Sequence, residues 1–149
     1  MIVSIGSDHR GIEQRKAIAT AVESAGHTVN DIGTHTEESC DYPDISSQVA
    51  GSVAAGTAER GILICGTGIG VAIAANKIHG VRAATCHDER TAKLSRNHNN
   101  ANVLCMPADT LDGDQMGKII AVWLSEDFEG GRHERRVNKI NALEQKART

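Results

Sequence analysis

A cysteine followed by a glycine-rich turn is the stretch whose residue types and spacing could carry chemistry. Cys65 precedes three glycines at every second position, in the order Cys65-Gly66-Thr67-Gly68-Ile69-Gly70. Such a turn can adopt positive φ, and its backbone N–H groups can converge on an anion. A thiol beside these groups is expected to ionise readily, which makes Cys65 a candidate base or nucleophile. The stretch also fits a buried cysteine beside a purely structural turn, and it does not separate the two interpretations.

The spacing of these glycines excludes two common phosphate-binding motifs. The dinucleotide-binding fingerprint requires G-x-G-x-x-G, and a P-loop ends in G-K-[S/T]. Here the glycines alternate with other residues, and no lysine follows Gly70. The turn therefore belongs to neither class.

Two further polar segments follow predicted strands and are expected at the same edge of the sheet as Cys65. Asp8-His9 follows the first strand, and Asp41-Tyr42 comes after the second. The carboxyl ends of parallel strands meet at one edge, where open α/β sheets bind ligands. The Asp-His pair also has a structural interpretation, because Asp at such a position commonly caps a helix.

His98-Asn99 lies at the end of a predicted helix rather than a strand. Asn favours helix caps and left-handed backbone, so this pair could simply terminate the helix. The remaining histidines show no pattern that argues for ligation: His27, His35, His79, His87 and His133.

The last predicted helix carries arginines on one face. Arg132 and Arg136 are four residues apart, and this spacing suits a phosphate clamp. Val137 and Ile140 give the same helix an apolar side, which suits docking on a partner subunit. Both roles can hold in one helix.

Strands and helices alternate along the chain, which predicts an α/β fold. We expect strands over residues 1–5, 28–32, 62–64, 81–86 and 102–106, with helices between and after them, the last over 132–146. This alternation implies a five-stranded parallel sheet with helices on both faces, hence three layers. A length of 149 residues predicts a single domain over 1–149.

Composition excludes several classes of protein. A net charge of −3 and an aromatic content of 2% argue against nucleic-acid binding. No apolar run approaches the roughly 20 residues of a membrane span, and the first residues lack a signal peptide's basic start. We therefore expect a cytoplasmic protein without membrane contact. The four cysteines form no C-x-x-C pair, which argues against zinc and for free thiols, with Cys86 and Cys105 in the core.

Five ordered motifs carry a resemblance to a known enzyme family. They are Ser7-Asp8-His9, Asp41-Tyr42-Pro43, the cysteine-glycine turn, Leu94-Ser95-Arg96-Asn97-His98-Asn99 and Gly130-Gly131-Arg132-His133. In this order they resemble the type B ribose-5-phosphate isomerases, within a wider family that includes galactose-6-phosphate, allose-6-phosphate and tetrulose-4-phosphate isomerases. The resemblance implies a Rossmann-like fold, a homodimer or homotetramer whose C-terminal helix packs on a partner subunit, and no metal or other cofactor.

The resemblance also implies a role for each candidate residue. Cys65 would be the base that moves a proton between C1 and C2 of the sugar through a cis-enediolate, with Thr67 beside it. His98 would assist ring opening and Asn99 would bind substrate, both supplied by the neighbouring subunit. Backbone N–H groups of residues 66–70 would stabilise the enediolate. The substrate would contact Asp8, His9, Asp41, Tyr42, Gly66, Gly68, Ile69 and Gly70, and its phosphate would be bound by Arg132 and Arg136.

Two positions depart from the family pattern. Pro107-Ala108-Asp109 stands where family members commonly carry Gly-Ser-Arg with a phosphate-binding arginine, and Asn100 stands where Asp is usual. Either the phosphate is held differently, with Arg135 or Arg10 helping, or the substrate differs. We expect interconversion of ribose 5-phosphate and ribulose 5-phosphate. The alternatives are isomerisation of a hexose 6-phosphate or a tetrulose 4-phosphate, and a non-catalytic sugar-phosphate-binding protein.

Overall fold

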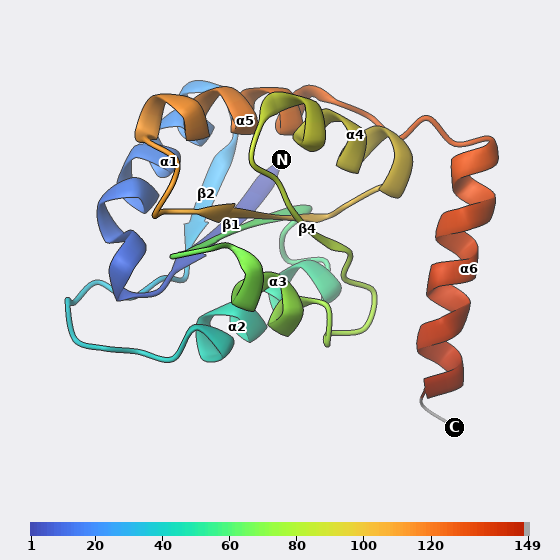
Figure 1. Cartoon of the computed structure of the whole chain (residues 1–149), viewed down its shortest axis with the longest axis horizontal. Coiled ribbons are helices and arrows are strands. Elements are labelled where there is room, and N and C mark those ends of the chain that lie inside the picture. The colour runs from blue at the N-terminus through green and yellow to red at the C-terminus, as the bar shows by residue number, and fades with distance from the viewer. Residues whose placement is uncertain (148–149) are drawn as a thin grey trace.

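The computed structural model describes residues 1–147 and places five parallel strands in one sheet (Figure 1). The strand order is β2-β1-β3-β5-β4, and every neighbouring pair is parallel. The predicted α/β class and the predicted parallel sheet are therefore confirmed. The strands are β1 (Ile2–Ser7), β2 (Thr28–Asp31), β3 (Arg60–Cys65), β4 (Ala83–Thr85) and β5 (Val103–Pro107).

Helices connect the strands, and local signals in the sequence fix where they begin and end. Asp88 and Asp112 form capping boxes at the starts of α4 and α5. Gly26 and Gly56 take positive φ just beyond the ends of α1 and α2, as expected for glycine after a helix C-terminus. The helices are the 3-10 turn η1 (His9–Gly11), α1 (Ile12–Ser24), α2 (Tyr42–Ala54), α3 (Ile69–Ala75), α4 (Glu89–Asn99), α5 (Gly113–Ser125) and α6 (Arg132–Ala147).

The helices cover both faces of the sheet and make three layers (Figure 1). One apolar cluster joins α1, α4 and α5 to the sheet and includes Trp123, which is fully buried. A second cluster joins α2 and α3 to the opposite face. Because side chains alternate along a strand, Ile62 and Ile64 enter the first cluster, whereas Leu63 and Cys65 enter the second. Cys65 therefore lies on the face covered by α2 and α3.

β4 is shorter than the predicted strand over 81–86, and side-chain amides bond to the backbone where it begins. The Ala83 N–H donates to Asn76 Oδ1 over 2.8 Å, and Asn76 Nδ2 donates to the Ala83 carbonyl over 3.0 Å. The Arg82 N–H donates to Asn102 Oδ1. These bonds occupy the backbone at the start of this edge strand.

α6 stands beside the rest of the molecule rather than against the sheet (Figure 1). His133 and Val137 are its buried residues. Ile140 and Leu143 are 44% and 64% exposed, although both are apolar. Within residues 1–147, no helix combines the length and the hydropathy that crossing a membrane requires.

Candidate active site

A cleft of about 390 Å³ lies at the carboxyl end of β3. β1 and β3 are neighbours in the sheet, so the turn after β1 and the turn after β3 form adjacent walls. The first residues of α2 and α3 complete the cleft. Its lining comprises Asp8, Arg10, Tyr42, Cys65, Gly66, Thr67, Ile69, Gly70 and Ile73.

Cys65 is the last residue of β3, and its thiol is held at the base of the glycine turn. The Gly68 N–H donates to Cys65 Sγ over 3.2 Å. The Ile69 N–H donates to Thr67 Oγ1 over 3.2 Å. The end of β3 is also bonded to the residue that follows the neighbouring strand β5, since the Ala108 N–H donates to the Cys65 carbonyl over 2.8 Å. The thiol thus lies in a fixed backbone setting.

The three glycines of the turn are needed for different reasons. Gly68 has φ +72°, and a Cβ there would lie 3.0 Å from the backbone carbon of Met106, so both conformation and space require glycine. A Cβ on Gly66 would lie 2.6 Å from Arg10 Nη1, and one on Gly70 would lie 2.6 Å from Tyr42 Cζ. Positive φ was the expected reason for glycine, and it applies to Gly68 alone. At the other two positions glycine makes room for a side chain.

The structure brings only some of the predicted polar residues to the cleft. Asp8 lines it, and its Oδ1 accepts from the Arg10 N–H over 2.9 Å, so Asp8 also caps η1. His9 does not line the cleft, because its Nδ1 accepts from the Cys40 N–H over 3.3 Å. Asp41 precedes α2, is exposed, and does not line the cleft either. Tyr42 covers Gly70 at the entrance.

The other predicted residues form a second cluster on α4 and α6. His98 and Asn99 end α4, and Arg132 and Arg136 lie in the first turns of α6. None of these four residues lines the cleft that contains Cys65. Within one chain, the predicted base therefore lies at a different place from the predicted ring-opening and phosphate-binding groups.

His133, for which the sequence predicted no role of its own, is the buried centre of this second cluster. Its ring stacks on that of His98, with centroids 4.0 Å apart and planes 9° from parallel. Burial lowers the pKa of His133, and the positive charges of His98 and Arg132 lower it further. The neutral ring accepts from Arg132 Nε over 3.4 Å at Nε2. His133 lies two residues after Gly131 and belongs to the Gly130-Gly131-Arg132-His133 motif, but its spacing gave it no predicted role in the site.

The same cluster contains the one group of side chains in residues 1–147 whose donor atoms approach closely enough for a metal. Atoms of His98, Glu129 and His133 lie within 4.8 Å of one another. Stacked imidazole rings direct their lone pairs in parallel rather than toward one point, and Arg132 already occupies Nε2 of His133. The arrangement suits a hydrogen-bonded cluster better than a metal centre.

The two departures from the family pattern have different structural settings. Asn100 is the C-cap of α4 with φ +48°, a left-handed conformation that Asn tolerates better than most residues. Asp109 follows β5 and pairs with Arg10, with Nη2 and Oδ1 2.7 Å apart. Asp109 therefore does reach the Cys65 region, where its N–H donates to the Gly66 carbonyl over 3.0 Å.

Comparison with known proteins agrees with this architecture. The sequence profile of the Ribose/Galactose Isomerase family matches residues 3–140. Ribose-5-phosphate isomerase B of Escherichia coli (strain K12) is 43% identical over 144 residues, which cover 97% of each chain. D-erythrulose-4-phosphate isomerase of Pectobacterium atrosepticum is 39% identical and covers 95% of this chain and 94% of its own.

Solved structures agree closely as well. That of Clostridium thermocellum ribose-5-phosphate isomerase B superposes with a TM-score of 0.96 at 46% identity and covers 99% of both chains. That of the Mycoplasma genitalium enzyme with bound ribulose-5-phosphate has a TM-score of 0.93 at 42% identity and covers 97% of this chain and 96% of that one. The fold and the site thus define a sugar-phosphate isomerase. The chain belongs to the Ribose/Galactose Isomerase family, as the ordered motifs predicted.

Proposed function

We propose that the protein interconverts ribose 5-phosphate and ribulose 5-phosphate, with Cys65 as the base. The observation that carries this proposal is the Cys65 thiol, which accepts from the Gly68 N–H at the base of an open cleft. The thiolate takes the proton from C2 of the open-chain aldose, and negative charge develops on the oxygen at C1. Transfer of the C2 hydroxyl proton to the oxygen at C1, together with return of the carbon-bound proton to C1, gives the ketose. Relatives named ribose-5-phosphate isomerase B support the choice of substrate.

The turn after β3 supplies the anion stabilisation that this step needs. Its Gly68 and Ile69 N–H groups are engaged by Cys65 Sγ and Thr67 Oγ1. The N–H groups of the other turn residues are the donors proposed for the enediolate oxygens. Donors fixed in place before the reaction need no reorganisation when charge develops. Thr67 positions the substrate beside the sulfur.

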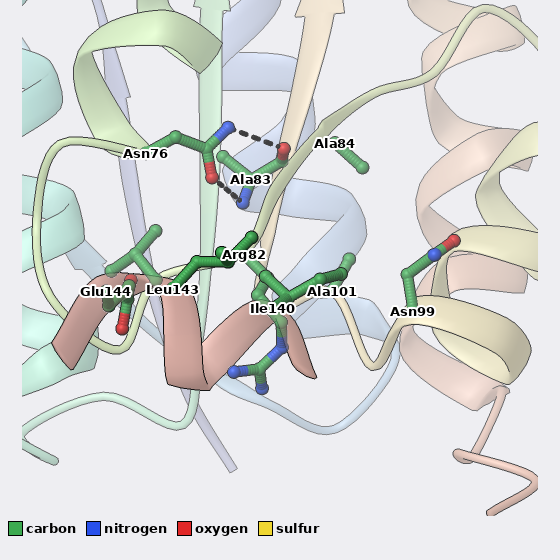
Figure 2. Close-up of a pocket in the computed structure, with 10 residues that line it drawn as sticks. Asn76, Arg82, Ala83, Ala84, Asn99, Ala101, Ile140, Leu143 and Glu144 are labelled. Atoms are coloured by element: carbon green, nitrogen blue, oxygen red, sulfur yellow. Dashed lines mark hydrogen bonds between the residues drawn. The ribbon is translucent and has the colours of Figure 1, made fainter. Parts of the chain in front are cut away.

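We infer that a second copy of the chain completes the site as a homodimer or as a dimer of dimers. His98, Asn99, Arg132 and Arg136 have no place in the Cys65 cleft of their own chain. Exposed apolar side chains lie on both surfaces that would meet: Ile69 and Ile73 at the cleft, and Ile140 and Leu143 on α6. A groove of about 440 Å³ runs between α6 and the start of β4 (Figure 2). In the assembly, the partner's α4 and α6 would bring ring-opening and phosphate-binding groups to Cys65.

The first experiment is the isomerisation of ribose 5-phosphate by the purified protein in EDTA. Turnover that disappears in Cys65→Ala, while circular dichroism and the unfolding transition stay unchanged, is the expected result. Cys105→Ala is not a suitable control because it removes core volume, whereas Cys40→Ala removes a partly exposed thiol outside the cleft and should keep full activity. An active Cys65→Ala variant would refute the assignment of the base. A protein that binds the sugar phosphate in D₂O without exchanging its C2 proton would instead be a binding module.

A second substrate class has specific support. Asp109 puts a carboxylate at the Cys65 region, and one relative is named D-erythrulose-4-phosphate isomerase. Measuring kcat/KM for ribose 5-phosphate, allose 6-phosphate, galactose 6-phosphate and erythrulose 4-phosphate separates these candidates. A clear preference for another sugar would replace ribose 5-phosphate while leaving the base assignment in place.

The shared site has its own test in mixed dimers. Cys65→Ala and the double variant Arg132→Ala/Arg136→Ala should each be inactive alone. Random re-association at equal amounts makes half of the dimers mixed, each with one intact site, so about a quarter of wild-type activity should return. If each chain formed a complete site by itself, both halves of a mixed dimer would be defective and no activity would return.

A further inference from the structure

An ion pair that the proposed mechanism does not use lies at the Cys65 cleft. Arg10 Nη2 and Asp109 Oδ1 are 2.7 Å apart, although the two residues are separated by 99 positions in the sequence. Arg10 belongs to η1 after β1, and Asp109 belongs to the turn after β5. The pair therefore connects the turns that follow the two strands flanking β3.

The backbone of each partner is held at the edge of the cleft, that of Arg10 by Asp8 and that of Asp109 by the turn after Cys65. The Arg10 N–H donates to Asp8 Oδ1 over 2.9 Å, and the Asp109 N–H donates to the Gly66 carbonyl over 3.0 Å. Their side chains meet directly above Gly66. A Cβ on that residue would lie 2.6 Å from Arg10 Nη1 and 2.9 Å from Asp109 Oδ2. The guanidinium is thus fixed next to the residue that follows Cys65.

The stability of the fold does not account for this arrangement. The two side chains are 55% and 43% exposed, and ion pairs at that exposure stabilise folded proteins little. A guanidinium has five N–H donors in a planar fork, and the pair occupies Nη2. The remaining donors lie at the cleft, where Arg10 is the only basic side chain among the lining residues that the structure describes.

We propose that Arg10 binds the phosphate of the substrate from the same subunit as Cys65, and that Asp109 is a positioning residue that holds the guanidinium above Gly66. This inference rests on the proposed function, because it requires a phosphorylated substrate in the cleft. The planar fork of Arg10 matches two phosphate oxygens. The phosphate is then bound from two sides, by Arg10 of one chain and by the arginines of the partner's α6.

The test is a KM-against-kcat comparison on Arg10→Met and Asp109→Ala, with inorganic phosphate as a competitive inhibitor. Losing a charge-assisted contact should raise KM of Arg10→Met about 10- to 100-fold and raise the Ki of phosphate in parallel, with kcat changed by less than about threefold. Arg10→Lys keeps the charge but not the fork and should be intermediate. Lys16→Met is the matched control, because Lys16 forms an exposed ion pair with Glu13 on α1, outside the cleft.

The role of Asp109 has its own readout. Asp109→Ala should raise KM about 3- to 10-fold because the guanidinium is no longer held, and Asp109→Asn, which keeps an oxygen acceptor, should restore most of the loss. A lower KM in Asp109→Ala would show that the carboxylate competes with the phosphate and would overturn the positioning role. A reduced kcat with an unchanged phosphate Ki in Arg10→Met would place Arg10 at the reacting atoms and overturn phosphate binding.

The inference and the proposed function fail in different ways. If the wild type isomerises ribose 5-phosphate and Arg10→Met keeps its KM and phosphate Ki, the inference is wrong and the function stands. If the wild type is inactive, calorimetric titration with inorganic phosphate still decides the matter. Binding that weakens in Arg10→Met supports the inference, and binding equal to that of the wild type refutes it.

Discussion

Replacing Gly68 by alanine tests whether the turn after β3 is as constrained as the structure indicates. An L-residue in the left-handed region costs about 1–2 kcal/mol, and Gly68 has φ +72°. The new Cβ would also lie 3.0 Å from the backbone carbon of Met106 and 3.2 Å from the nitrogen of Pro107. These are backbone atoms of a central strand and cannot move aside, so the steric overlap adds about 1–3 kcal/mol to the loss of stability. The expected loss in the free energy of unfolding is therefore about 2–5 kcal/mol.

Urea unfolding followed by tryptophan fluorescence measures this loss. Trp123 is the only tryptophan in the sequence and is fully buried, so its emission reports exposure of the core. With a slope of about 2 kcal/mol per molar urea, the midpoint should fall by about 1–2.5 M. Protein concentration must be the same for all variants, because assembly would shift the midpoint.

Gly117→Ala is the matched control for this experiment. Gly117 lies inside α5, and nothing approaches within 4 Å of the position of its Cβ. Alanine there should stabilise the protein by about 0.5–1 kcal/mol. A Gly68→Ala midpoint at or above that of the wild type would refute the reasoning, since neither left-handed strain nor the contact with β5 would then exist. A variant that folds should also lose activity, because moving the Gly68 N–H removes a donor from Cys65 Sγ.

Three further predictions follow from neighbouring features. Gly70→Ala should displace the half-exposed Tyr42 ring and lower the free energy of unfolding by less than about 1 kcal/mol, and adding Tyr42→Ala should remove that cost in a double-mutant cycle. Burial and nearby positive charge lower the pKa of His133, so stability should fall with acid below its ordinary value near 6.5, and urea midpoints of His133→Asn should change less with pH. Burial raises the pKa of Cys86 and of Cys105; mass spectrometry should find both unlabelled by iodoacetamide until the protein unfolds.

The fold was predictable because its signals are local. An apolar run at 62–64, a glycine turn and an apolar helix predicted over 71–77 follow one another, and β3 and α3 overlap these segments. The same reasoning placed the loop over 33–41 and the helix that starts at Tyr42. The start of β4 was mispredicted because the Arg82 N–H bonds to the side chain of Asn102, a contact between side chain and backbone that hydropathy does not reveal.

The site was predictable only where it follows the strand ends. Asp8 comes directly after β1, and Cys65 is the last residue of β3. Because β1 and β3 are neighbours in the sheet, the topology alone brings the two residues together. The stacking of His133 on His98 depends on how residues 126–131 return α6 to α4, and no periodicity encodes that path. The Arg10–Asp109 pair joins positions 99 residues apart, and the sequence could name Arg10 only as one of two possible helpers.

The distribution of charge explains why neither half of the proposed site is sufficient alone. The Cys65 cleft contains a thiol, a glycine turn and a single basic side chain, Arg10, whose charge is partly balanced by Asp109. α6 carries Arg132 and Arg136 but lines no part of that cleft. A phosphate monoester carries nearly two negative charges, which one half-neutralised guanidinium matches poorly. Joining the two surfaces would place three arginines around one phosphate and cover apolar side chains on α3 and α6 at the same time, so assembly and substrate binding would favour each other.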